Sequence, residues 1–244
     1  MRSHASSSGD AQEPALRTLF RVIASRDRTT ASRLLAESPL LARQAIEVGA
    51  TREAANTYFF EEIAHYAYAG DTPLHMAAAA YQVAIAGQLV SSGANVRARN
   101  RRGAEPLHYA ADGSPGSRAW DPDAQYAIVE FLITAGADPN AADKSGVAPL
   151  HRAVRTRCAA AVRALLTNGA DARGRNTNGS TPLHLAIRNT GRGGSGSAAS
   201  HEEQIEIIRL LLRHGARPSD KDSAGKSVED SVKADWLHAL LRDA

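Results

Sequence analysis

The sequence has a single cysteine, few aromatic residues and no long apolar run. Cys158 alone cannot form an intrachain disulfide or a cysteine zinc cluster. No segment reaches the roughly 18 consecutive apolar residues of a transmembrane helix, and the Ser-rich segment 1–14 lacks the apolar region of a secretion signal. These absences favour a cytoplasmic protein that does not enter the membrane.

Aromatic residues make up only 5% of the chain, although 43% of it is hydrophobic. Alanine and leucine must therefore provide most of the packing, which suits helices stacked closely in rows. The formal net charge of +3 is too small to indicate a nucleic-acid partner by itself. Arginine strongly outnumbers lysine and alanine is abundant, a bias typical of GC-rich genomes, so we expect a bacterial source.

The triplet Pro-Leu-His occurs four times, with proline at positions 73, 106, 149 and 182, and so at steps of 33, 43 and 33 residues. A Gly-Ala pair follows each triplet, at positions 93, 136, 169 and 215. Apolar residues recur at helical spacing between the two markers. Proline suits the first helical position because it has no N–H to leave unpaired, and glycine suits the left-handed residue that ends a helix. The pattern predicts a repeated unit of helix, turn and helix, followed by a hairpin loop.

This unit resembles the ankyrin repeat, whose signature is Thr-Pro-Leu-His-x-Ala on a 33-residue period. Residues 72–77 and 181–186 match in full, whereas Glu105 and Ala148 replace the threonine in the other two copies, which we expect to be slightly less rigid. The resemblance covers residues 70–244 and implies an all-α solenoid with repeats at 70–102, 103–145, 146–178 and 179–224. It also implies a structural role, not metal binding, for the repeated motif residues Pro73, His75, Pro106, His108, Pro149, His151, Pro182 and His184.

The segments outside these repeats are expected to close the two ends of the stack. We predict a disordered tail at 1–14, a helical cap with an aromatic linker at 15–69, and a C-terminal cap at 225–244. The linker holds five of the twelve aromatic residues between Tyr58 and Tyr68. Phe59, Phe60 and Ile63 are expected to seal the first repeat, with contact to a partner as the alternative.

Two insertions, 113–123 and 191–203, fall at the same point of the second and fourth repeats and should leave the same edge of the stack. Surface loops tolerate added length at small cost, so both can be structurally neutral. Trp120 favours the alternative, because an aromatic side chain on a long loop can anchor a partner.

The resemblance implies a monomeric, non-enzymatic module that binds another protein through its concave hairpin and inner-helix face, without metal or cofactor. The family's variable contact positions correspond here to Tyr68, Asp71, Arg101, Arg102, Ala104, Asp112, Lys144, Ser145, Val147, Arg155, Thr156, Thr177, Asn178, Ser180, Arg188 and Asn189. Arginines also recur along the predicted hairpins, at positions 97, 99, 101, 102, 173 and 175. They predict a positive edge that is either merely solvated or attracts an acidic partner.

Two other functions stay open at this point. The arginine-lined edge could bind nucleic acid, although no aromatic residues interleave with the arginines. The segment from Tyr58 to Tyr68, with His65, is the best host for an enzyme site. Cys158 has Arg155 and Arg157 nearby, which could lower its thiol pKa, but no histidine in the local sequence could orient it as a nucleophile.

Overall fold

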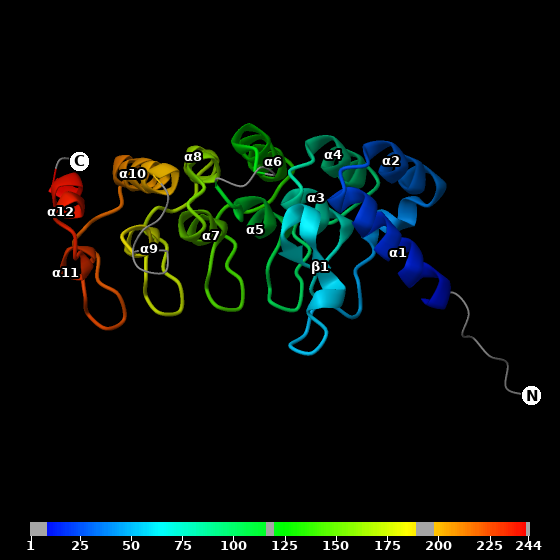
Figure 1. Ribbon diagram of the computed structural model, residues 1–244, viewed down its shortest axis with the longest axis horizontal. Helices are drawn as coiled ribbons and strands as arrows, with labels where there is room; N and C mark the ends of the chain where they lie inside the picture. Colours follow the sequence, from blue (N-terminus) through cyan, green and yellow to red (C-terminus); the bar gives the residue numbers. More distant parts are fainter. Residues whose placement is uncertain (1–8, 116–119, 189–197, 243–244) are drawn as a thin grey trace, which may run out of the picture.

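The computed structural model describes residues 9–115, 120–188 and 198–242, which form two rows of helices with loops projecting from one row (Figure 1). The inner row, beside the loops, holds α1 (Gly9–Ala24), α3 (Pro73–Ala79), α5 (Pro106–Ala111), α7 (Pro149–Arg155), α9 (Pro182–Ala186) and α11 (Val228–Ser231). The outer row holds α2 (Arg28–Glu37), α4 (Val83–Ser91), α6 (Pro122–Thr134), α8 (Ala159–Thr167), α10 (Ala198–Arg213) and α12 (Asp235–Arg242). The predicted all-α repeat solenoid is confirmed.

The four repeated histidines join each unit to the next. In the first unit, the backbone N–H of Thr72 donates to His75 Nδ1 at 3.1 Å, and His75 Nε2 lies 3.1 Å from the carbonyl oxygen of Ala104. The other three histidines repeat both contacts and reach the carbonyls of Val147, Ser180 and Lys226. Each histidine thus satisfies an otherwise orphaned helix N-terminus and ties it to the following unit.

Each hairpin loop begins with an asparagine or aspartate whose Oδ1 accepts the backbone N–H groups two and four residues later. These residues are Asn100, Asp143, Asn176 and Asp222. The glycine three residues later has a left-handed φ, as at Gly103 (76°), which glycine adopts without steric cost.

Neighbouring loops are also linked by backbone hydrogen bonds. The N–H of Arg101 donates to Ala69 O at 2.7 Å, and the N–H of Lys144 donates to Arg102 O at 3.0 Å. In the next two loops, the N–H of Thr177 donates to Ser145 O and the N–H of Ser223 donates to Asn178 O.

The core is built from alanine, leucine and isoleucine, as the low aromatic content predicts. Tyr109 is the largest fully buried side chain. No helix in the described ranges combines the length and apolar character needed to cross a bilayer.

The two insertions partly extend helices instead of loops. Helix α6 begins at Pro122 and helix α10 at Ala198, so these outer helices have 13 and 16 residues against nine in α8. The predicted loop boundaries at 123 and 203 are therefore wrong. Residues 116–119 and 189–197 lie outside the described residues, and the shared edge of the two loops stays a prediction.

The N-terminal boundary also differs from the prediction. Helix α1 already begins at Gly9 and contains Pro14, so a disordered tail extending to residue 14 is wrong. Residues 1–8 are not among those described.

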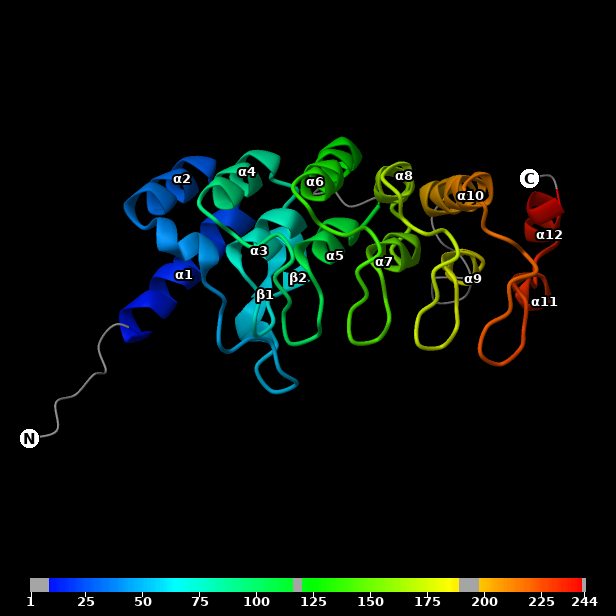
Figure 2. The ribbon, with the colours of Figure 1, turned by 180° about the vertical axis from the view of Figure 1, so that it is seen from behind.

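The segment between α2 and α3 contains a short β-hairpin. After a 3₁₀ helix at Pro39–Arg43, the chain forms a 3₁₀ turn at Asn56–Tyr58, strand β1 (Phe59–Phe60), a second turn at Glu61–Ile63 and strand β2 (His65–Tyr66). The strands pair antiparallel, with Phe59 opposite Tyr66. We call residues 56–66 the aromatic hairpin. It lies over α3 (Figure 1), and Figure 2 gives the view from the opposite side.

The aromatic hairpin packs against the core through two of the three residues expected to seal the first repeat, and also through Tyr58. Tyr58 is buried, and its hydroxyl lies 2.6 Å from a guanidinium nitrogen of Arg17 on α1. Phe60 and Ile63 are partly buried and pack against the core, whereas Phe59 is 37% exposed. Successive side chains of a strand face opposite sides, so Phe59 and Phe60 cannot both seal the first repeat.

Candidate functional site

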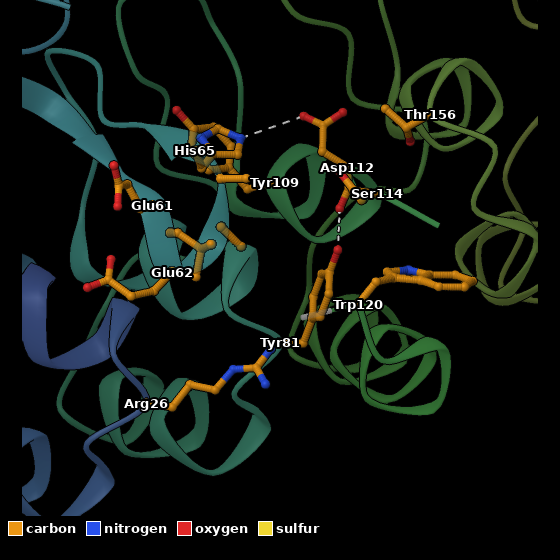
Figure 3. A pocket seen from close by; sticks show the side chains of 14 residues that line it. Arg26, Glu61, Glu62, His65, Tyr81, Tyr109, Asp112, Ser114, Trp120 and Thr156 are labelled. Atoms are coloured by element: carbon orange, nitrogen blue, oxygen red, sulfur yellow. Dashed lines mark hydrogen bonds and ion pairs between the residues drawn. The ribbon is translucent and has the colours of Figure 1, made fainter. Parts of the chain in front are cut away.

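A cavity of about 580 Å³ lies between the aromatic hairpin and the ends of the inner helices (Figure 3). Helices α3, α5 and α7 all end at it, because Ala79, Asp112 and Thr156 are among its lining residues. The repeat brings these ends together, since α3, α5 and α7 each start at Pro-Leu-His and run in the same direction. We call this space the helix-end cavity.

His65 attaches the aromatic hairpin to α5. Its ring stacks on Tyr109 with centroids 4.2 Å apart and an interplanar angle of 29°. Its Nε2 lies 3.8 Å from Asp112 Oδ2, while Nδ1 lies 2.9 Å from the carbonyl oxygen of Tyr66. These contacts give His65 a positioning role on the wall of the cavity.

Asp112 forms a chain of ion pairs with Arg152 and Asp143. Arg152, buried on α7, donates to Asp112 Oδ2 at 2.9 Å and to Asp143 Oδ2 at 3.3 Å. Burial alone would raise the pKa of Asp112, but the contact with His65 and the charge of Arg152 outweigh it and hold this pKa below its ordinary value. Asp112 is therefore ionised at neutral pH.

A second cavity, of about 320 Å³, adjoins the first. Both are lined by His65, Tyr109 and Asp112, and the second continues toward the loop residues Arg102 and Ser145. Together they form one depression along the inner helices and loops, which we call the inner groove. Cavities of this size accommodate side chains or small ligands.

Three of the six hairpin-loop arginines form ion pairs within the protein. Arg97 pairs with Asp138 at 3.5 Å, and Arg99 with Glu105 at 3.0 Å. Arg173 binds Asp220 through two hydrogen bonds, of 2.6 and 2.9 Å. Since Asp138 and Asp220 belong to the following unit, Arg97 and Arg173 link units. The predicted positive edge is therefore neutralised at these three positions.

Arg101 and Arg102 both contact the ring of Tyr68, with guanidinium carbons 5.4 and 4.7 Å from its centroid. A guanidinium nitrogen of Arg101 also donates to the carbonyl of Ala50. Both arginines are exposed to solvent, but they also hold the first loop together.

Two segments match known repeat models. Residues 69–101 match an ankyrin repeat, and residues 119–222 match a model of three consecutive ankyrin repeats. The chain belongs to the ankyrin repeat family. No curated protein matches it. Ankyrin repeats generally mediate protein–protein interaction, and proteins built from them are typically non-enzymatic scaffolds.

The predicted contact residues, those carried over from the ankyrin family together with Trp120, differ in their exposure. The exposed ones are Arg101, Arg102, Lys144, Ser145, Arg155, Thr177, Asn178 and Arg188. The partly buried ones are Tyr68, Asp112, Trp120, Val147 and Thr156. Asn189 lies outside the described residues.

Three predicted contacts, Asp71, Ala104 and Ser180, are buried, which contradicts a direct role in binding. The Asp71 carboxylate accepts hydrogen bonds from the N–H of Tyr68, the side chain of Asn100 and the hydroxyl of Tyr109. The carbonyls of Ala104 and Ser180 face the repeated histidines. These positions hold the ankyrin stack together.

Trp120 faces the helix-end cavity, and its Nε1 donates to Gln125 Oε1 at 2.9 Å. The Trp120 ring therefore forms part of the wall of the helix-end cavity.

The sequence analysis did not identify Tyr81, Glu61 or Arg152 as residues of this site. Arg152 occupies the variable position of Pro-Leu-His-x-Ala, and a charged residue in a helix that should be buried was the available signal.

The remaining chemical candidates find little support. Cys158 is buried, and burial raises the pKa of its thiol to about 11, so the nearby arginines do not activate it. Among the described residues, no three His, Cys, Asp or Glu side chains group together as metal ligands.

Proposed function

We propose that this ankyrin repeat protein is a monomeric, non-enzymatic module that binds another protein in the inner groove, and that it works in the cytoplasm. The observation that carries the proposal is the pair of adjoining cavities over the inner helices. Exposed side chains of the loops, such as Arg102 and Ser145, line the second of them.

The construction of the groove supports this function. Its walls are fixed by the histidine bonds between units and by the backbone bonds between loops. A surface held in place before binding loses little conformational entropy when a partner docks. Side chains at the loop tips can vary without disturbing these backbone bonds, which leaves them free to determine specificity.

Charge on the loops does not by itself favour an acidic partner, because Arg97, Arg99 and Arg173 are already paired. The same pairing weakens the nucleic-acid alternative, which needs unpaired cations along the edge. Exposed Arg155 ends α7 and lines the second cavity, and exposed Arg188 follows α9 in the next unit, so these two side chains remain the clearest reporters of binding at this face.

The test compares two double charge reversals. Arg155→Glu with Arg188→Glu alters the inner face, whereas Arg209→Glu with Arg213→Glu places the same changes on exposed positions of outer helix α10. Tagged variants are used to capture proteins from the native host, and the affinity of each captured protein is then measured after purification. We expect the inner-face variant alone to lose a partner. A partner lost only by the outer-helix variant, or equally by both, contradicts the proposal.

A further inference from the structure

The helix-end cavity has an acidic wall in a chain whose net charge is +3. Glu61 and Glu62, on the second turn of the aromatic hairpin, are exposed and lie at one side of the cavity (Figure 3). Neither has an ion-pair partner within the described part of the chain, unlike the loop arginines. Arg26 also lines the cavity, below Glu62 in Figure 3, with its guanidinium group directed toward Tyr81.

The backbone adds to this negative potential. Helices α3, α5 and α7 all end at the cavity, and the carbonyl end of a helix carries partial negative charge. Cations are stabilised at such ends. The carboxylates and the helix ends therefore favour the same kind of ligand.

The remaining walls are aromatic. Tyr81 and Trp120 are partly buried and lie together opposite the glutamates (Figure 3). The Tyr81 hydroxyl donates to the carbonyl of Asp112 at 2.6 Å, and Trp120 is fixed through Gln125, so both rings are held in place. Aromatic faces attract organic cations, and a guanidinium group stacks on them while it hydrogen-bonds to carboxylates.

We infer that the helix-end cavity receives an arginine side chain presented by the partner protein, with its guanidinium group between Glu61 or Glu62 and the rings of Tyr81 and Trp120. This inference rests on the proposed function. The volume of about 580 Å³ leaves room for the whole side chain. A metal ion is the poorer fit, because the described carboxylates and histidines do not cluster as ligands.

The test uses N-acetyl-arginine amide as the probe and N-acetyl-citrulline amide as its neutral isostere. Trp236→Phe leaves Trp120 as the single tryptophan, so Trp120 fluorescence reports binding. We expect the arginine probe to bind saturably and weakly, as a single side chain should, and the citrulline probe to bind at least about tenfold more weakly.

Glu61→Gln with Glu62→Gln should weaken binding of the arginine probe by about tenfold, a few-fold for each exposed charge. Glu130→Gln with Glu229→Gln, at exposed positions elsewhere, should leave binding unchanged. Equal binding of the two probes, equal loss in both glutamine variants, or no saturable binding would overturn the inference.

Failure here can be distinguished from failure of the proposed function. If the arginine probe does not bind but a captured partner still depends on Arg155 and Arg188, the inner groove binds protein without an arginine in this cavity. If no captured protein depends on the inner face, the proposed function fails regardless of the probe result.

Discussion

Replacing Arg152 with methionine should destabilise the protein far more than replacing Arg155 with methionine, although both arginines approach Asp112. The Arg152 side chain is 11% exposed and lies 2.9 Å from Asp112, whereas Arg155 is 59% exposed and 3.9 Å away. Methionine has similar length and flexibility, so it can retain much of the packing. The two variants therefore isolate the effect of burial on the same type of ion pair.

The expected magnitudes follow from that difference. Arg152→Met leaves Asp112 and Asp143 without their shared counter-charge, and breaking a buried ion pair in this way costs about 3–5 kcal/mol. Arg155→Met removes a pair screened by solvent, which is worth less than about 1 kcal/mol. For a chain of this size, the melting temperature should fall by roughly 6–20 °C in the first variant.

The stability lost in Arg152→Met should also depend on pH. Arg152 helps to hold the pKa of both aspartates below their ordinary value, against the opposing effect of burial. A lowered folded pKa stabilises the folded state above the unfolded pKa, and this stabilisation disappears as the pH falls through the folded value. The deficit of Arg152→Met relative to the unchanged protein should thus be fully present near pH 7 and shrink as the pH falls below about 4, the ordinary aspartate pKa.

Urea unfolding of the two variants and the unchanged protein, repeated across this pH range, measures the three free energies. Losses of similar size for Arg152→Met and Arg155→Met would refute the reasoning about burial. If the free energy of unfolding of Arg152→Met stays below that of the unchanged protein by the same amount down to acid pH, the loss does not come from the unpaired carboxylates of Asp112 and Asp143.

Three further predictions concern other parts of the stack. Burial lowers the pKa of His108 from 6.5 to about 4, so between pH 6.5 and about pH 4 the unfolded state binds more protons than the folded state. As the pH is lowered through this range, this group alone should reduce the free energy of unfolding by about 3 kcal/mol. Urea titrations should show a smaller reduction for His108→Gln than for the unchanged protein. Cys158, with a thiol pKa of about 11, should react with an aromatic disulfide at pH 8 at least about a hundredfold more slowly in native than in denatured protein; similar rates would contradict its burial. Gly103→Ala should lower the melting temperature more than Gly136→Ala. Both glycines have positive φ (76° and 105°), but only at Gly103 would a Cβ atom meet a neighbour, the backbone nitrogen of Lys144 at 3.0 Å.

The repeated region was predictable because local backbone requirements recur with the same residues. Proline at the first helical position and glycine at positive φ each meet a need that few other residues can meet. The period of 33 residues follows from those markers. The loop residues Asn100 and Asp143 carry a comparable signal, since each bonds two N–H groups of its own loop, and this signal was available but not used.

The candidate site was predicted less well because its contacts join residues far apart in the sequence. Nothing near Phe60 or His65 shows that their rings lie against Phe20 and Tyr109, with centroids 6.4 and 4.2 Å apart. The sequence displays the charge of Arg173 but not its pairing with an aspartate 47 residues later. Asp71 occupies one of the variable positions at which ankyrin repeats contact their partners, but here it is buried.

The aromatic hairpin has a consequence for how the stack comes apart. A stack joined only through neighbouring units can unravel from an end, one unit at a time. The hairpin lies over α3 and also contacts α1 through Phe60 and α5 through His65. It therefore joins three successive helix pairs, which we call the first three layers. Under heat or mechanical load, the first three layers should therefore be lost in one cooperative step, after the C-terminal units have already opened.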